Sequence, residues 1–142
     1  MLHTFAICAY KESEYLEECI LSLINQKVKS KILIATSTPN AYIEELAKKY
    51  NIPVYVNDGE SGITQDWNFA LSKVDTKLAT IAHQDDVYEP EYTYEFVKAM
   101  RGSKRPLIAF SDYGEIRNGK KTTNLDMLRI KEIMMIPLRL RL

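Results

Sequence analysis

Short apolar runs alternate with amphipathic helical stretches along most of this chain, and that alternation restricts the fold more than any other feature. Strands are predicted at residues 5–10, 31–36, 54–56, 78–82 and 107–111. Helices are predicted at residues 13–24, 42–50, 65–73 and 91–100. Such alternation implies an α/β fold with a mostly parallel sheet covered by helices on both faces. A hairpin is predicted at Asn118-Gly119.

Two of the predicted helices carry more detailed signals. Ser13 is expected to cap the first helix, with Glu14, Glu17 and Glu18 near its start, where carboxylates suit the helix dipole. In the helix at 65–73 the residues expected to share one face are Trp67, Ala70, Leu71 and Val74.

Length and charge exclude some classes of protein. A chain of 142 residues can form one domain with a real core. Its 19 basic and 19 acidic residues cancel, which argues against a general nucleic-acid binder. Cys8 and Cys19 are expected to be small core residues. No apolar run reaches the ~18 residues of a membrane span, and the start lacks a basic signal-peptide region, so the expected compartment is the cytoplasm.

A pair of acids, Asp85 and Asp86, follows the predicted strand at 78–82 and precedes Pro90. In parallel α/β sheets, ligands lie beyond the carboxyl ends of the strands. Adjacent carboxylates are stabilised by a positive partner, and Mg²⁺ and Mn²⁺ prefer oxygen ligands. Asp85 and Asp86 are therefore candidate metal ligands. The alternative is a solvated turn in which an aspartate caps the next helix.

The other strand ends add polar and aromatic groups. Tyr10 and Glu12 follow the first strand, Ser37 and Thr38 follow the second, and Gln84 follows the fourth. An aromatic ring, small hydroxyls and a carboxylate pair could hold a base, a ribose and a metal-bound diphosphate. Each group also has a structural alternative: Tyr10 as an edge core residue, and the Thr-Ser-Thr run as a helix cap.

The order and spacing of these motifs resemble the family 2 glycosyltransferases of the GT-A fold. The similarity covers roughly Phe5 to Tyr113. It rests on Ala9-Tyr10-Lys11-Glu12, Ser22-Leu23-Ile24-Asn25-Gln26, the Asn57–Gly62 loop, Trp67-Asn68, the Asp85–Pro90 segment and Phe110-Ser111-Asp112-Tyr113.

The resemblance implies a Rossmann-like GT-A fold, a nucleotide-sugar donor (usually a UDP-sugar), Mg²⁺ or Mn²⁺, and an unknown glycan or lipid-linked acceptor. Residues 1–117 would form the donor-binding domain. The nucleotide-binding positions carried over are Ala9, Tyr10, Glu12, Ser37, Thr38, Asn68, Gln84 and Asp85, with Asp85 and Asp86 as metal ligands.

Three positions depart from the family pattern. Ser37 stands where an acid is expected to bind the base; its hydroxyl can accept a hydrogen bond from a uracil N–H, but more weakly than a charged acceptor. His83 replaces the first acid of an Asp-x-Asp motif and is expected to have a positioning or core role. Trp67 replaces an arginine and is expected to pack in the core rather than stack on sugar.

The last stretch, 118–142, is expected to be the start of an acceptor-side region, apparently truncated. Asp112, Asp126 and Glu132 are available as a catalytic base, but their context carries no signature, so the base is unassigned. The apolar, basic tail from Leu128 to Leu142 is expected to pack on another domain or a second copy of the chain, with contact to a membrane surface as the alternative.

These features predict a metal-assisted glycosyltransferase whose present chain binds nucleotide but transfers little sugar. The alternative is a non-catalytic nucleotide-binding or interaction module on the same fold. A nucleotidyltransferase would need a glycine-rich phosphate loop near the first strand, and Tyr10-Lys11-Glu12 contains no glycine.

Overall fold

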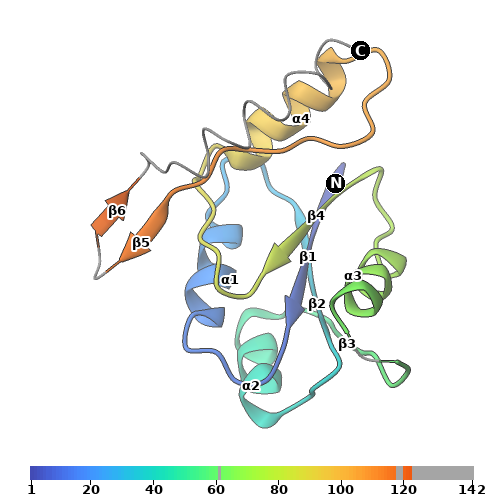
Figure 1. The fold of residues 1–142 in the computed structure, drawn as a ribbon, viewed down its shortest axis with the longest axis vertical. Helices are drawn as coiled ribbons and strands as arrows, with labels where there is room; N and C mark the ends of the chain where they lie inside the picture. The colour runs from blue at the N-terminus through green and yellow to red at the C-terminus, as the bar shows by residue number, and fades with distance from the viewer. Residues whose placement is uncertain (61, 118–119, 123–142) are drawn as a thin grey trace. The chain divides into compact units, whose positions relative to one another are not determined.

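A computed structural model describes residues 1–60, 62–117 and 120–122. The chain divides into two compact units, Met1–Pro106 and Leu107–Leu142. The functional assignment of residues 1–117 and 118–142 stays a prediction. In chain order, the first unit contains β1 (His3–Ala9), α1 (Leu16–Ile24), β2 (Lys31–Thr36), α2 (Ala41–Tyr50), β3 (Val54–Val56), α3 (Ile63–Ser72), β4 (Leu78–His83) and α4 (Tyr92–Gly102) (Figure 1).

The four strands of the first unit form one parallel sheet in the order β3-β2-β1-β4. The chain builds outward from β1 to β3 and then crosses back, so that β4 lies on the other side of β1. In this topology the carboxyl ends of β1, β2 and β4 meet at the point where the strand order reverses, which is where open α/β sheets bind ligands. The α/β class and the parallel sheet are confirmed.

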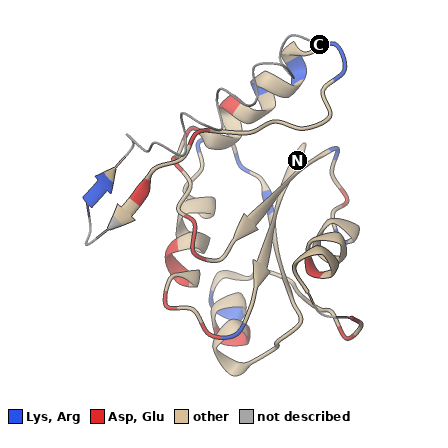
Figure 2. Ribbon diagram, in the orientation of Figure 1, with Lys and Arg blue, Asp and Glu red and all other residues tan. Residues whose placement is uncertain are grey.

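Helices cover both faces of the sheet, as the strand pattern predicts (Figure 1). Because side chains alternate along a strand, Phe5 and Ile7 of β1 join a core cluster with α1 and α2, whereas Ala6 packs with α3 on the opposite face. Figure 2 shows that β1, β3 and β4 carry no Lys, Arg, Asp or Glu, as expected of strands covered by helices.

Two local predictions for helices are wrong. Ser13 does not cap α1: the helix starts at Leu16 after Tyr15, and the Ser13 hydroxyl accepts a hydrogen bond from the Tyr15 N–H in the turn before it. On α3, Phe69 packs beside Ala70 in the core while Leu71 is exposed. The face packed on the sheet therefore contains Ala70 and Val74, as predicted, together with Phe69 in place of Trp67 and Leu71.

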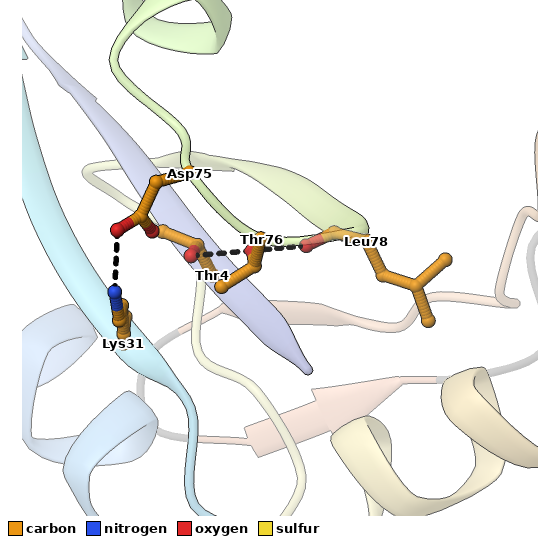
Figure 3. A network of polar contacts seen from close by, with 5 residues as sticks. All are labelled: Thr4, Lys31, Asp75, Thr76 and Leu78. Atoms are coloured by element: carbon orange, nitrogen blue, oxygen red, sulfur yellow. Dashed lines mark hydrogen bonds and ion pairs between the residues drawn. The ribbon is translucent and has the colours of Figure 1, made fainter. Parts of the chain in front are cut away.

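Buried polar groups at the amino ends of the strands are joined to each other. The Thr4 hydroxyl lies 2.7 Å from that of Thr76, which donates to the Leu78 carbonyl at 2.8 Å (Figure 3). The imidazole of His3 contacts the hydroxyls of Ser30 and Thr80, both at 2.9 Å. These contacts satisfy the polar atoms within the protein, as burial requires.

In the second unit, the strand predicted at residues 107–111 is wrong and the predicted hairpin is confirmed. Residues 107–111 form no strand, and Leu107, Ile108 and Phe110 are 87%, 67% and 74% exposed. An apolar run favours extended backbone, but a strand also needs a pairing partner, which local sequence does not specify. β5 (Glu115–Arg117) pairs antiparallel with β6 (Lys120–Thr122) on either side of Asn118-Gly119.

The predictions for Asp126, Glu132 and the tail from Leu128 to Leu142 lie outside the described residues. Within the described part of the chain, no helix is long and apolar enough to cross a membrane.

Candidate functional site

The carboxyl ends of β1, β2 and β4 bring most of the predicted site residues to one edge of the sheet. Register fixes this arrangement, because Cys8 lies opposite both Ala35 of β2 and His83 of β4. The residues that follow these three positions therefore leave the sheet side by side. Ala9, the last residue of β1, is buried and can contribute only backbone atoms to a ligand.

Asp85 and Asp86 lie on the turn directly after β4, and both are exposed. The turn is closed by the Asp86 N–H, which donates to the His83 carbonyl at 3.2 Å. Partial desolvation is the main reason that the pKa of Asp86 is raised, and the neighbouring Asp85 raises it further, while His83 lowers it. A cation would favour the ionised form of this carboxyl and remove that unfavourable interaction.

The carboxylate pair suits a cation that also binds a substrate phosphate. Among the residues that the structure describes, no group of three or more His, Cys, Asp or Glu side chains could hold a metal ion. Asp85 and Asp86 therefore offer an incomplete set of oxygen ligands. Mg²⁺ is commonly bound by one or two carboxylates, with phosphates and water completing its coordination, and the pair fits that pattern.

His83 and Trp67 lie beside the acid turn and contact each other. Their rings are 5.2 Å apart in an edge-to-face arrangement. His83 is the last residue of β4 and Trp67 comes from α3, with 36% of its surface exposed. This contact agrees with a positioning role for His83. Trp67 is exposed and belongs to neither core cluster of the described residues, so the prediction that it packs in the core is wrong.

Gln84 joins the end of β4 to the end of β1. Its amide oxygen accepts from the Tyr10 N–H at 3.0 Å, and its amide nitrogen donates to the Tyr10 carbonyl at 2.9 Å. Through these two bonds the Gln84 side chain pairs with the Tyr10 backbone just beyond the last backbone pair of β1 and β4. Both ends of the Gln84 amide are engaged, so its direct effect is to fix Tyr10, a residue that is 52% exposed at the predicted base position.

Thr38 joins the end of β1 to the end of β2. Its hydroxyl accepts from the Lys11 N–H at 2.6 Å. Lys11 has a φ of 55°, a left-handed conformation that is uncommon for a residue other than glycine. Strained backbone of this kind concentrates at functional sites. It turns the chain sharply after Tyr10, and the exposed Glu12 follows. The cap of α2 is Asn40, so Thr38 does not serve as the cap.

Ser37 has a partner that the sequence analysis missed. Its hydroxyl donates to a carboxylate oxygen of Asp66 at 3.0 Å, and the other oxygen of Asp66 accepts from the Asn57 side chain at 2.9 Å. An acid is thus present next to the position where the motif after β2 lacks one, but it comes from the first turn of α3. The one signal in the sequence was an acid directly before Trp67-Asn68.

The remaining predicted residues are one asparagine and two cysteines. Asn68 lies on α3 and is exposed. Cys8 and Cys19 are free thiols, and burial raises the pKa of Cys8 to about 11 and that of Cys19 to about 12. Thiols this hard to ionise are poor nucleophiles and metal ligands, so their predicted role as packing residues agrees with the structure.

Comparison with known proteins places these observations in a family. The family model described as Glycosyl transferase family 2 matches residues 4–138. Among solved structures, S. aureus TarS is similar at a TM-score of 0.63 and 17% identity, over 72% of this chain and 20% of that one. A structure of S. aureus TarS residues 1–349 gives 0.63 and 15%, over 81% of this chain and 40% of that one. The chain thus spans less than half of either structure. The search of curated proteins finds no match.

Proposed function

Because the chain belongs to glycosyl transferase family 2, we propose that it is the donor-binding part of a glycosyltransferase that uses a nucleotide diphosphate sugar and a divalent cation. The donor is a UDP-sugar in this proposal, and the cation is Mg²⁺ or Mn²⁺. Its acceptor is an unknown glycan or lipid-linked molecule. The reaction takes place in the cytoplasm or at the inner face of the membrane, where two free thiols are kept reduced. A second copy of the chain is a further proposed partner.

One observation carries the proposal. The exposed pair Asp85 and Asp86 lies at the carboxyl end of β4, next to the end of β1, at the reversal of the strand order. Two acids there create a negative surface that a diphosphate would avoid without a cation. The pairing of acid turn and phosphate therefore requires the metal.

The residues along the edge have distinct roles in this proposal. Asp85 and Asp86 would hold the cation, which when bound acts as a Lewis acid on the diphosphate leaving group. The exposed ring of Tyr10 offers a surface for the base, and its backbone is fixed by Gln84. The Ser37 hydroxyl donates a hydrogen bond to Asp66, so the lone pairs of its oxygen can accept a hydrogen bond from a base N–H.

The experiment that tests this function is calorimetry of the chain with UDP, CDP, ADP and GDP, each with and without Mn²⁺. Wild type is expected to bind a nucleoside diphosphate at least tenfold more tightly with Mn²⁺, which corresponds to ~1.4 kcal/mol. Asp85→Ala or Asp86→Ala is expected to remove most of that gain.

Asp75→Asn is the matched control, because Asp75 is an exposed acid paired with Lys31 and lies with it at the amino-end network (Figure 3). It should bind like wild type. Unchanged affinity in both Asp85→Ala and Asp86→Ala would return the acid pair to a capping or solvated role. Little or no sugar transfer is expected of this chain under both hypotheses, so transfer by the chain alone does not separate the enzyme from the non-catalytic module.

A further inference from the structure

Gln26 is a fully buried polar residue that joins α1 to the segment after the acid turn. Its side-chain nitrogen donates to the Glu89 carbonyl at 2.8 Å and to the Ser22 carbonyl at 3.1 Å, and lies 3.5 Å from the Tyr88 carbonyl. Its side-chain oxygen accepts from the backbone N–H of Thr93 at 2.9 Å and from the Thr93 hydroxyl at 3.1 Å. Only 1% of its surface is exposed. A neutral amide with this many partners fixes the geometry of every group it contacts.

Three further residues of α1 and the turn after it form hydrogen bonds to the chain around the acid turn. The Ser22 hydroxyl accepts from the Tyr88 N–H at 3.1 Å and donates to the Cys19 carbonyl at 2.7 Å. The Cys19 thiol donates to the His83 carbonyl at 3.3 Å. Beyond the helix, the Lys27 N–H donates to the Pro90 carbonyl at 2.9 Å.

These contacts fall on both sides of the acid pair. Cys19 holds the chain at His83, before the acids, whereas Ser22 and Gln26 hold it at Tyr88 and Glu89, after them. Cys19, Ser22 and Gln26 are spaced by three and four residues, so they follow one side of α1 and continue past its end. The turn with Asp85 and Asp86 is thus a short span anchored at both ends on one helix.

We propose that Ser22 and Gln26 are positioning residues that hold the turn from residue 84 to residue 90 so that Asp85 and Asp86 present their carboxylates together to a metal-bound nucleoside diphosphate. Neither residue touches the ligand. This inference rests on the proposed function for its ligand, but the anchoring of the turn is independent of any ligand. Because Gln26 is neutral, it orders the turn without competing with the cation for the carboxylates.

The test compares Ser22→Ala and Gln26→Leu with Thr4→Val. Thr4 is also buried and its hydroxyl is hydrogen-bonded to Thr76, but at the amino ends of the strands, away from the acid turn (Figure 3). All three variants lose buried or half-buried hydrogen bonds, so all three should lose stability in thermal unfolding. Two readouts separate them: UDP affinity with and without Mn²⁺, and amide hydrogen exchange of residues 84–90.

Ser22→Ala is expected to weaken UDP binding about fivefold in Mn²⁺ and to leave binding without metal almost unchanged. It should also speed exchange across residues 84–90. Thr4→Val should do neither, and Ser22→Thr, which keeps the hydroxyl, should restore both. Gln26→Leu should have a larger effect, and Ser22→Ala provides the answer if that variant does not fold.

The outcomes separate this inference from the proposed function. If wild type binds no nucleotide with Mn²⁺, the proposed function fails, and faster exchange of residues 84–90 in Ser22→Ala still supports the anchoring. If exchange and the metal-dependent affinity change no more in Ser22→Ala and Gln26→Leu than in Thr4→Val, the positioning role is overturned.

Discussion

The two ends of the same parallel sheet use polar residues in opposite ways. At the amino ends, His3 and Thr4 are each 1% exposed, and their polar atoms are satisfied by Ser30, Thr76 and Thr80. At the carboxyl ends, polar side chains are exposed and keep unused hydrogen-bonding capacity; these are Glu12, Asp85 and Asp86. The first set stabilises the fold, and the second is available to a ligand.

The presence of polar residues alone therefore does not identify a ligand-binding site in this fold. Thr4 and Thr38 are the same residue type at opposite ends of the sheet. Thr4 is enclosed, whereas Thr38 fixes a strained backbone turn at Lys11 beside the exposed Tyr10 ring. Variants that affect stability should therefore concentrate at the amino ends, and variants that affect binding at the carboxyl ends.

The largest expected effect is the loss of stability in acid through His3. Burial lowers the pKa of His3 from 6.5 to about 4. The unfolded chain therefore binds a proton at His3 more readily than the folded chain does. The free energy of unfolding is highest above pH 6.5, where His3 is neutral in both states, and it decreases as the pH falls toward 4. The decrease is at most ~3 kcal/mol. Urea unfolding at pH 6.5 and pH 4 should show a shallower pH slope for His3→Leu than for wild type; equal slopes would contradict the prediction.

A smaller effect, on binding, is expected from Asp66→Asn. Without the carboxylate, the Ser37 proton is no longer held by a charged acceptor, and the hydroxyl can rotate. Uracil presents an N–H at ring position 3 where cytosine presents an acceptor. We therefore expect wild type to prefer UDP over CDP and the variant to lose about fivefold of that preference, or ~1 kcal/mol. Competition binding measures this, and a preference unchanged from wild type would remove Asp66 from base recognition.

The pH dependence of stability at the acid turn is expected to be opposite to that at His3. The raised pKa of Asp86 means that its ionised form is disfavoured in the folded protein. Its contribution to stability is present at low pH and is lost as the pH rises through the raised pKa. Asp86→Asn should therefore raise the melting temperature slightly at pH 7 while it weakens Mn²⁺-dependent binding. A melting temperature well below that of wild type would show that Asp86 stabilises the fold.

The smallest expected effect is at the Lys31–Asp75 pair. Its atoms are 2.5 Å apart, but the two side chains are 47% and 67% exposed. Exposed ion pairs typically contribute less than ~1 kcal/mol, and salt screens them. Asp75→Asn should change the free energy of unfolding by ~0.5 kcal/mol or less, and 1 M NaCl should remove the difference. A larger change would mean that the amino-end network depends on this surface charge.

The sequence predicted well whatever depends on local pattern. The alternation of apolar and helical stretches specified β1 to β4 and the intervening helices, because burial on both faces leaves a continuous apolar signal in the central strand β1. The prediction of a strand at residues 107–111 was wrong because strand formation depends on a distant partner. Asp66 was missed for the same reason, since only the packing of α3 brings it to Ser37.

The roles of Gln84 and Gln26 were also beyond local pattern. The prediction that Gln84 binds nucleotide stays a prediction, and the structure adds that its amide joins Tyr10 to the end of β4. Gln26 belonged to a motif whose purpose the sequence did not explain. Both glutamines act on backbone atoms far away in the chain, and neither partner can be identified before the strand order is known.

The hydrogen bonds that anchor the acid turn also constrain how the chain reaches its native state. Ser22 and Tyr88 are separated by 66 residues, and Gln26 and Thr93 by 67. Contacts this distant close long loops and form only when most of the chain is in place. The cation site should therefore be absent from partly folded forms. A ligand that binds there would select the complete fold and stabilise the whole first unit, so that nucleotide with Mn²⁺ should slow its proteolysis.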